Sequence, residues 1–276
     1  KQVFEHLFDN KTYKKKDMWK TSNGRWRHPF RHPGKVYKTL DSLWKEDRQI
    51  NDLAKKYILS ADVIAITIGG SELWRNPNTK LGYTTIPFPD VFNDQMPNIA
   101  EVYTLTFQEH LDCLDFIYKT IRRVNPKAEL IFTVSPHRMT FTVSEKDVVQ
   151  ATCQGKSTIR TAVGEFTDRI KENASYFHSY EIVEYAEYPE LFYDSDFRHV
   201  NRFAIEVVMN EFIRLFANSE LYNENDYSKI ATMYKDKKNI LAIQEIVKEQ
   251  KQKFNVIDAV NRVKKAILLF LLVFKK

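Results

Sequence analysis

Two short apolar runs, each ended by residues that stop a strand, constrain the fold of this chain more than any other feature. Val63–Ile68 reads VIAITI and is followed by a Gly-Gly pair, and residues 130–134 read LIFTV and are followed by Ser-Pro. Continuous apolar runs of this length are typical of strands buried on both faces of a parallel sheet. The sequence therefore predicts two such strands.

Segments with helical spacing of apolar residues separate these runs. The spacing predicts helices over residues 40–59, over about 20 residues ending near Val124, and over residues 146–173 and 200–216. A third strand is predicted in SYFHSYEIV, residues 175–183, and a long polar loop over residues 74–97. This alternation indicates βαβ units and hence an α/β protein with a parallel sheet covered on both faces. Functional groups in such sheets gather at the carboxyl ends of strands, here residues 69–72, residues 135–138 and the loop that carries Asp196 and His199.

The domain organisation follows from length and composition. With 276 residues, 43% of them hydrophobic, the chain can bury one sizeable core and add a small appendage. We expect an α/β domain over residues 1–217 and a helical extension over residues 218–276. Residues 1–39 are predicted to be an irregular loop, whose arginines and aromatics either bind a sugar or an anion or simply hold the loop in place.

Charge and cysteine content bear on the partners and cofactors expected for this chain. The net charge of +6 comes from scattered lysines typical of solvated faces, and no nucleic-acid module is present, so no nucleic-acid partner is expected. Cys113 and Cys153 have no CxxC spacing, so no metal is expected. The CQGKST stretch lacks the glycine spacing of a phosphate-binding loop, and no cofactor is predicted.

No signal peptide or membrane span is visible, which predicts a cytoplasmic protein. The apolar run in residues 266–276 is shorter than the roughly 20 residues that a bilayer core requires. Two interpretations of this segment remain, a helix packed on the domain or a peripheral contact with a membrane or partner.

The pattern DSDFRH, residues 194–199, has two interpretations. An aspartate near a helix start commonly caps the helix, and Asp194, Ser195 or Asp196 would do so here, with His199 as a bystander. Alternatively, Asp196 holds one imidazole nitrogen of His199 so that the other nitrogen can accept a proton from a nucleophile.

Five segments, in order, favour the second interpretation. They are ADVIAITIGGSELWRN, NPKAELIFTVSPHR, DVVQATCQGKSTIRTAVGEF, YFHSYEIV and the late DxxH. From about Arg25 to Phe216 the chain resembles the GSCFA family, a branch similar to the SGNH (GDSL-like) hydrolases. The resemblance implies a flavodoxin-like, three-layer α/β/α fold and a Ser-His-Asp esterase or O-acyl transferase acting mostly on acyl groups of carbohydrates. It also implies that Asp196 is the carboxylate and His199 the general base.

The same resemblance indicates further site residues. GGSE, residues 69–72, occupies the place of the block that supplies an oxyanion-stabilising Asn in SGNH enzymes, so Gly70, Ser71 and Glu72 are candidates for oxyanion or substrate binding. Ser71 is a weaker candidate for the nucleophile, because GGSEL lacks the second glycine of the G-x-S-x-G turn. The remaining candidates are His137, which either lines the cleft or is structural, and Lys156 with Ser157, which either face the substrate or lie on a solvated helix face.

The nucleophile of the resembled family is missing from this chain. No strand followed by GSC or GDS occurs before Asp62, and the sheet is expected to be one central strand short. Either the serine lies in a segment ahead of Lys1, or the chain is an inactive family member that kept the fold as a carbohydrate-binding or scaffold module.

Overall fold

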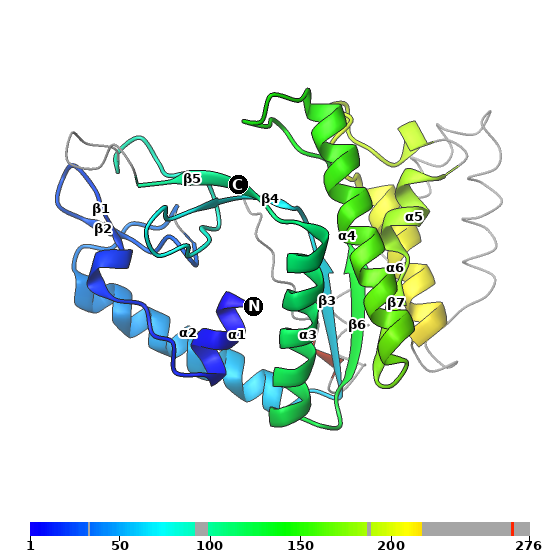
Figure 1. Cartoon of the computed structure of the whole chain (residues 1–276), viewed down its shortest axis with the longest axis horizontal. Coiled ribbons are helices and arrows are strands. Elements are labelled where there is room, and N and C mark those ends of the chain that lie inside the picture. Colours follow the sequence, from blue (N-terminus) through cyan, green and yellow to red (C-terminus); the bar gives the residue numbers. More distant parts are fainter. Residues whose placement is uncertain (33, 92–98, 187–188, 217–265, 268–276) are drawn as a thin grey trace, which may run out of the picture.

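The computed structural model describes residues 1–32, 34–91, 99–186, 189–216 and 266–267. These residues form an α/β structure in which a small parallel sheet packs against helices (Figure 1). An N-terminal part lies to one side of the sheet, and the helix α2 (Leu40–Ser60) connects this part to the first strand of the sheet.

The sheet has the strand order β7-β6-β3-β8. The strands β3 (Val63–Ile68), β6 (Glu129–Val134) and β7 (Ala174–Phe177) are parallel, with Val63 opposite Glu129 and Leu130 opposite Ala174. The first two strands confirm the predictions from the apolar runs. On the other side of β3, Val63 and Ile64 pair with β8 (Ala266–Ile267), which is the pairing seen at that edge among the described residues.

The third predicted strand is correct only to Phe177. Ser179–Glu184 forms the helix α5 instead, in which Tyr180 and Val183 are buried. Aromatic and β-branched residues favoured a strand here, but these two buried positions lie three residues apart, which is the spacing of one helix face. The Ser179 hydroxyl also donates to the carbonyl of Val134, 3.0 Å away, and so ties the start of α5 to β6.

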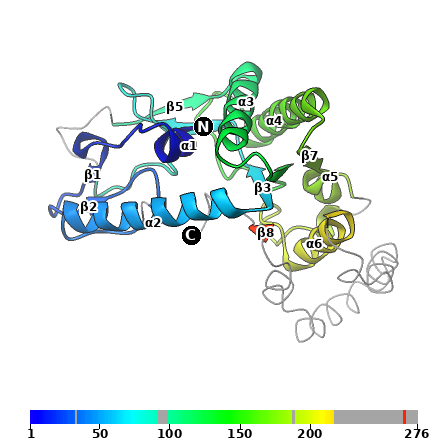
Figure 2. The ribbon, with the colours of Figure 1, turned by 90° about the horizontal axis from the view of Figure 1, so that it is seen from below.

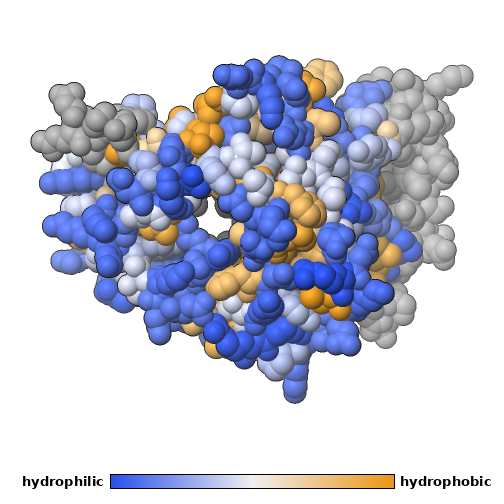
Figure 3. Space-filling view, viewed as in Figure 1, coloured by the Kyte–Doolittle hydropathy of each residue, from blue (hydrophilic) through white to orange (hydrophobic). Residues whose placement is uncertain are grey.

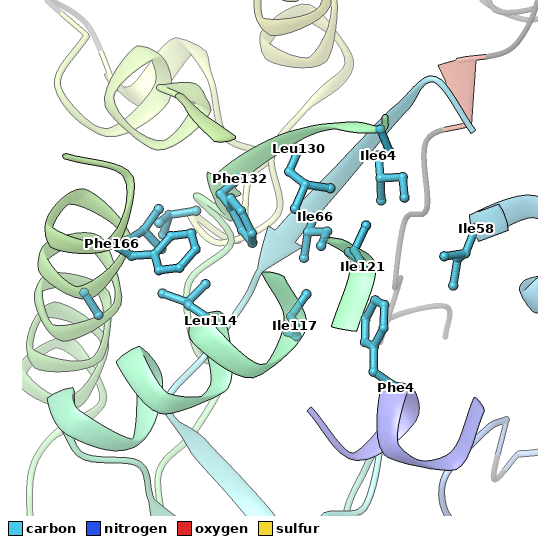
Figure 4. Close-up of a cluster of buried hydrophobic side chains, with 14 of the residues drawn as sticks. Phe4, Ile58, Ile64, Ile66, Leu114, Ile117, Ile121, Leu130, Phe132 and Phe166 are labelled. Carbon is cyan, nitrogen blue, oxygen red and sulfur yellow. The ribbon is translucent and has the colours of Figure 1, made fainter. Parts of the chain in front are cut away.

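Helices cover both faces of the sheet (Figure 2). The helices α3 (Phe107–Val124) and α4 (Val148–Ile170) confirm two predictions and pack on one face. Their side chains contact Ile64, Ile66 and Phe132 in the main core (Figure 4). Successive strand residues point to opposite faces, so the intervening Ala65 and Ile131 pack with Phe177 toward α6 (Arg202–Phe216), the last predicted helix.

The predicted polar loop over residues 74–97 is partly wrong. β4 (Glu72–Arg75) pairs antiparallel with β5 (Glu101–Thr104), so the segment between them is the connection of a hairpin-like pair. The cation of Arg75 lies 3.5 Å from the ring centre of Tyr103, a contact across the pair that the loop prediction did not anticipate.

The N-terminal prediction of an irregular loop is also partly wrong. The helix α1 (Gln2–Phe8), the short 3-10 helix η1 (Lys15–Asp17) and the two-residue strands β1 (Trp19–Lys20) and β2 (Trp26–Arg27) form there. Most of the aromatic residues hold this part in place, in a second apolar cluster that includes Tyr13, Trp19, Phe30, Tyr37, Leu43 and Tyr83.

A buried carboxylate joins the N-terminal part to α2. Asp47 lies 3.4 Å from Nε2 of His6 and 3.3 Å from Nε2 of His28, and it accepts a hydrogen bond of 3.1 Å from Nε of Arg31. Burial by itself raises the pKa of Asp47, but these cationic and hydrogen-bonding partners outweigh burial and hold the pKa below its ordinary value. Arg31 thus binds a carboxylate of the protein itself and holds the N-terminal part in place.

Most of the predicted helical extension, residues 218–276, lies outside the described residues. Ala266 and Ile267, which belong to the predicted packed helix or membrane contact at residues 266–276, form the strand β8. None of the helices in the described part of the chain is long and apolar enough to span a bilayer. The face in Figure 3 is mostly hydrophilic, with an apolar area near α3.

Candidate active site

The loop between residues 193 and 200 is closed at its base and does not begin the helix. Tyr193 and Val200 form an antiparallel bridge, and the side-chain amide of Asn201 donates to the carbonyls of Leu191 (2.7 Å) and Tyr193 (3.1 Å). The Oδ1 atom of Asn201 accepts from the backbone N–H of Ala204, 3.0 Å away. The helix cap is therefore Asn201, and the expectation that Asp194, Ser195 or Asp196 caps this helix is wrong.

Asp196 and His199 interact directly inside this loop. Oδ2 of Asp196 is hydrogen bonded to Nδ1 of His199, while Oδ1 accepts the backbone N–H groups of Arg198 and His199, both at 2.9 Å. The backbone and side-chain hydrogen bonds from His199 hold the pKa of Asp196 well below its ordinary value. A carboxylate only accepts, so Nδ1 carries the hydrogen and Nε2 has a free electron pair, which is the tautomer that a general base requires.

Arg198 lies between two imidazoles and was not among the residues predicted from the sequence. Its Nη2 atom is 3.1 Å from Nε2 of His199, and its Nη1 atom is 3.0 Å from Nε2 of His137. The two imidazole rings are 4.7 Å apart, centre to centre, in an edge-on arrangement. Burial, with the charges of Arg198 and then His199, lowers the pKa of His137 to about 4, so this imidazole is neutral near pH 7. The sequence did contain a signal for Arg198, because a basic residue stands directly before the histidine of DxxH.

Arg138 connects the loop after β6 to the Asp196–His199 loop. Its guanidinium donates to both carboxylate oxygens of Glu184 on α5, at 3.0 and 3.1 Å, and to the carbonyl of Phe197 at 3.2 Å. The hydroxyl of Tyr193 donates to the same carboxylate at 2.7 Å. These contacts place His137 beside His199. Glu184 was also missed from the sequence, because its partners Arg138 and Tyr193 meet it only in the folded chain.

Lys156 joins the carboxyl ends of β3 and β6 from α4. Its side chain is buried, and Nζ donates to the carbonyls of Gly69 (2.6 Å) and Ser135 (2.5 Å). Burial lowers the pKa of this amine to about 8. Lys156 therefore does not lie on a solvated helix face, whereas the neighbouring Ser157 is exposed.

Ser71 and Glu72 line a pocket of about 360 Å³ between the start of α3 and the first turns of α4. Ser71 is buried against Gly155, where an added Cβ would lie 2.6 Å from the serine Oγ. Glu72 accepts a hydrogen bond of 2.7 Å from the hydroxyl of Thr142. Gly70, which directly precedes Ser71 in the sequence, is exposed. Asp196, His199 and His137 do not line this pocket.

The structure thus brings together part of the predicted site. One cluster at the carboxyl edge of the sheet contains Asp196, His199 and His137. Lys156 binds the ends of β3, which leads to the pocket, and of β6, which leads to His137. Among the described residues, no group of three or more His, Cys, Asp or Glu side chains could hold a metal ion.

The fold and the site define an α/β protein with a carboxylate-oriented histidine at the carboxyl edge of a parallel sheet. The GSCFA family model matches residues 1–212, so the chain belongs to the GSCFA family. No curated protein and no solved structure matches the sequence.

Proposed function

We propose that this protein is an esterase or O-acyl transferase that acts on carbohydrate esters through Ser-His-Asp chemistry, on a three-layer, flavodoxin-like fold similar to that of SGNH hydrolases. The observation that carries the proposal is the pair of Asp196 and His199, in which the carboxylate holds Nδ1 and leaves Nε2 as an acceptor. Membership in the GSCFA family supports the same chemistry.

In this proposal His199 moves one proton twice. Its Nε2 takes the proton of a serine hydroxyl as the serine oxygen bonds to the ester carbonyl carbon, and the carbonyl oxygen becomes an oxyanion. Asp196 stabilises the imidazolium that forms. The imidazolium then gives its proton to the leaving alcohol as the carbon–oxygen bond of the ester breaks. Water or an acceptor hydroxyl takes the acyl group in the second half of the reaction.

The serine would come from a strand encoded ahead of Lys1. In the described part of the chain, the hydrogen bonds of the His199 ring go only to Asp196 and Arg198, and not to a serine or threonine hydroxyl. Among the same residues, the edge of β3 opposite β6 is paired only at Val63 and Ile64. A parallel strand along the rest of that edge would end at the carboxyl side of the sheet, where His199 lies.

The pocket beside Ser71 supports a carbohydrate substrate. Phe107 supplies an aromatic ring, and Glu72, Gln154 and Thr158 supply hydrogen-bonding groups. Such a mixture of apolar and polar groups suits a sugar, which has apolar faces and many hydroxyls. Ser71 would donate to the oxyanion or to the sugar from the wall of this pocket.

The alternative is a carbohydrate-binding or scaffold protein without catalysis. The contact of Arg198 with Nε2 of His199 favours this alternative, because the position from which a serine would donate its proton is occupied by a guanidinium. The two functions differ in whether the protein turns over an ester.

Turnover of p-nitrophenyl acetate tests the proposal in a protein that carries, together with this chain, the proposed segment ahead of Lys1. His199→Ala should lower kcat/KM by about 10³-fold or more, because the serine loses its base. His32→Ala, which removes an exposed histidine of the N-terminal part, is the matched control and should leave turnover unchanged. Equal turnover in the His199→Ala protein would contradict the proposed base, and absence of turnover in the unmodified protein would favour the binding function.

A further inference from the structure

The guanidinium of Arg198 has an unusual set of partners for a partly buried cation. Its closest side-chain contacts are the Nε2 atoms of His137 and His199, at 3.0 and 3.1 Å. Its nearest carboxylate atom is Oδ2 of Asp196, 3.9 Å from Nε and beyond hydrogen-bond distance. Because a guanidinium can only donate, the Nε2 atom of each imidazole acts as an acceptor in this arrangement.

A comparison with Arg138 shows what a structural arginine does in the same loop cluster. Arg138 binds Glu184 through two carboxylate oxygens, so its charge is neutralised by an anion in the planar geometry that guanidinium prefers. Arg198 instead contacts the Nε2 atoms of two imidazoles. The two imidazoles leave the positive charge of Arg198 uncompensated, apart from the more distant Asp196.

We propose that Arg198 is the anion-binding residue of this site: the two imidazoles hold its guanidinium when the site is empty, and it transfers to the oxygens of a carboxylate or an ester oxyanion when one enters. Guanidinium has five N–H groups, and the contacts with His137 and His199 use only part of them. The Arg198 side chain is 21% exposed, so solvent and small ligands reach it.

When the ligand is an ester, the transfer of Arg198 from the imidazoles to the ligand is coupled to proton transfer. This coupling is the one step that rests on the proposed function. When Nε2 of His199 takes the serine proton, it changes from an acceptor to a donor and can no longer accept from Arg198. The same step bonds the serine oxygen to the carbonyl carbon and moves the carbonyl electron pair onto oxygen. Arg198 thus loses an acceptor at the moment when a new anionic acceptor forms.

The charges around the two imidazoles are consistent with this exchange. Asp196 is bound to the other nitrogen of His199 and to two backbone N–H groups, so most of its acceptor sites are already used. Lys156 contributes a positive charge near His137 and is bound to two carbonyls. An incoming anion therefore meets net positive charge.

Acetate is a suitable probe, and its binding is read from the imidazole ¹⁵N signals of the labelled protein at constant pH and ionic strength. Acetate should shift the Nε2 signals of His137 and His199 in a saturable manner, since it removes their donor. Arg198→Gln should weaken acetate binding by about tenfold or more, the loss expected for one charge-assisted hydrogen bond pair. Arg198→Lys keeps the charge without the fork and should bind with intermediate affinity.

Arg202→Gln is the matched control. Arg202 lies four residues further along on α6 and pairs with Glu206 at 2.9 Å, so this variant removes the same charge close by without touching the imidazoles. It should bind acetate as the unmodified protein does. Equal acetate affinity in the Arg198→Gln protein, or no response of the imidazole signals in the unmodified protein, would overturn the proposal.

These measurements need no ester turnover, so the two proposals fail separately. Acetate binding that depends on Arg198, combined with turnover that is unaffected by His199→Ala, would keep the anion site and reject the esterase. Turnover that depends on His199, combined with acetate binding that is unchanged in Arg198→Gln, would keep the esterase and reject the role of Arg198.

Discussion

Asp196 illustrates how far a single residue could be understood from sequence. A three-residue spacing brings a carboxylate and an imidazole within reach in a tight loop, so the contact between Asp196 and His199 could be expected from DxxH. The contact of Arg198 with His137 could not be expected in this way, because 61 residues separate them and their meeting depends on how two loops pack. The capping role was misassigned for a related reason, since Asn201 closes the loop through contacts that only the folded chain provides.

Lys156 gives a prediction about stability and pH at the residue scale. Burial lowers its pKa from 10.5 to about 8, so between pH 8 and 10.5 the unfolded chain holds a proton that the folded chain has released. The folded state is penalised by this amine below pH 8, and the penalty disappears as pH rises toward 10.5. The free energy of unfolding should therefore gain on the order of 3 kcal/mol from this group across the window.

Urea unfolding of the unmodified protein and of Lys156→Met measures this contribution. The difference between the two free energies of unfolding should change with pH over that window, because methionine has no proton to release. Lys119→Met on α3, which replaces an exposed lysine by the same residue, is the control. A pH-independent difference for Lys156→Met would show that the amine is not held in the buried position described here.

At the scale of elements, strands could be predicted where both faces are buried, because their residues are continuously apolar and do not alternate with polar ones. β3 and β6 read as continuous apolar runs, and their bounds follow the sequence closely. β4 and β5 were missed because each is four residues long and only half-buried, so neither shows a clear period. The helix α5 was missed because the aromatic and β-branched residues of SYEIV favour a strand, and its helical contacts come from distant parts of the chain.

Two glycines of α4 give a matched pair for a second prediction. Replacing a helix-interior glycine with alanine favours the helix by about 1 kcal/mol. At Gly164 the added Cβ would lie 2.7 Å from Nη1 of Arg160, the end of a flexible side chain that can move. At Gly155 it would lie 2.6 Å from Oγ of Ser71, which is buried. Gly164→Ala should therefore stabilise the protein, and Gly155→Ala should give no gain or a loss.

The assignment to Ser71 is checked by a double variant. In a Ser71→Ala background the clashing oxygen is absent, so Gly155→Ala should regain a stabilisation of about 1 kcal/mol, as measured by urea unfolding. If Gly155→Ala stabilises the protein equally with and without the Ser71 hydroxyl, then the helix α4 does not hold Ser71 in the pocket wall.

For the whole molecule, the α/β class followed from the alternation of strands and helices, whereas the N-terminal part did not. Its structure depends on Asp47 meeting His6 and His28, which lie 41 and 19 residues away along the chain. Residue types alone could not indicate that these polar groups meet in a buried cluster. The same limit applies to the pocket beside Ser71, which combines residues from four separate segments.

The central claim is that His199 and Asp196 serve a serine at the carboxyl edge of this sheet. Labelling with a fluorophosphonate tests it most directly, because an activated serine oxygen bonds to phosphorus and displaces fluoride. If a segment ahead of Lys1 supplies the serine, we predict one labelled serine in that segment and a rate of labelling that falls by about 10³-fold in His199→Ala. A label on Ser71, or labelling at an unchanged rate in the His199→Ala protein, would contradict the claim.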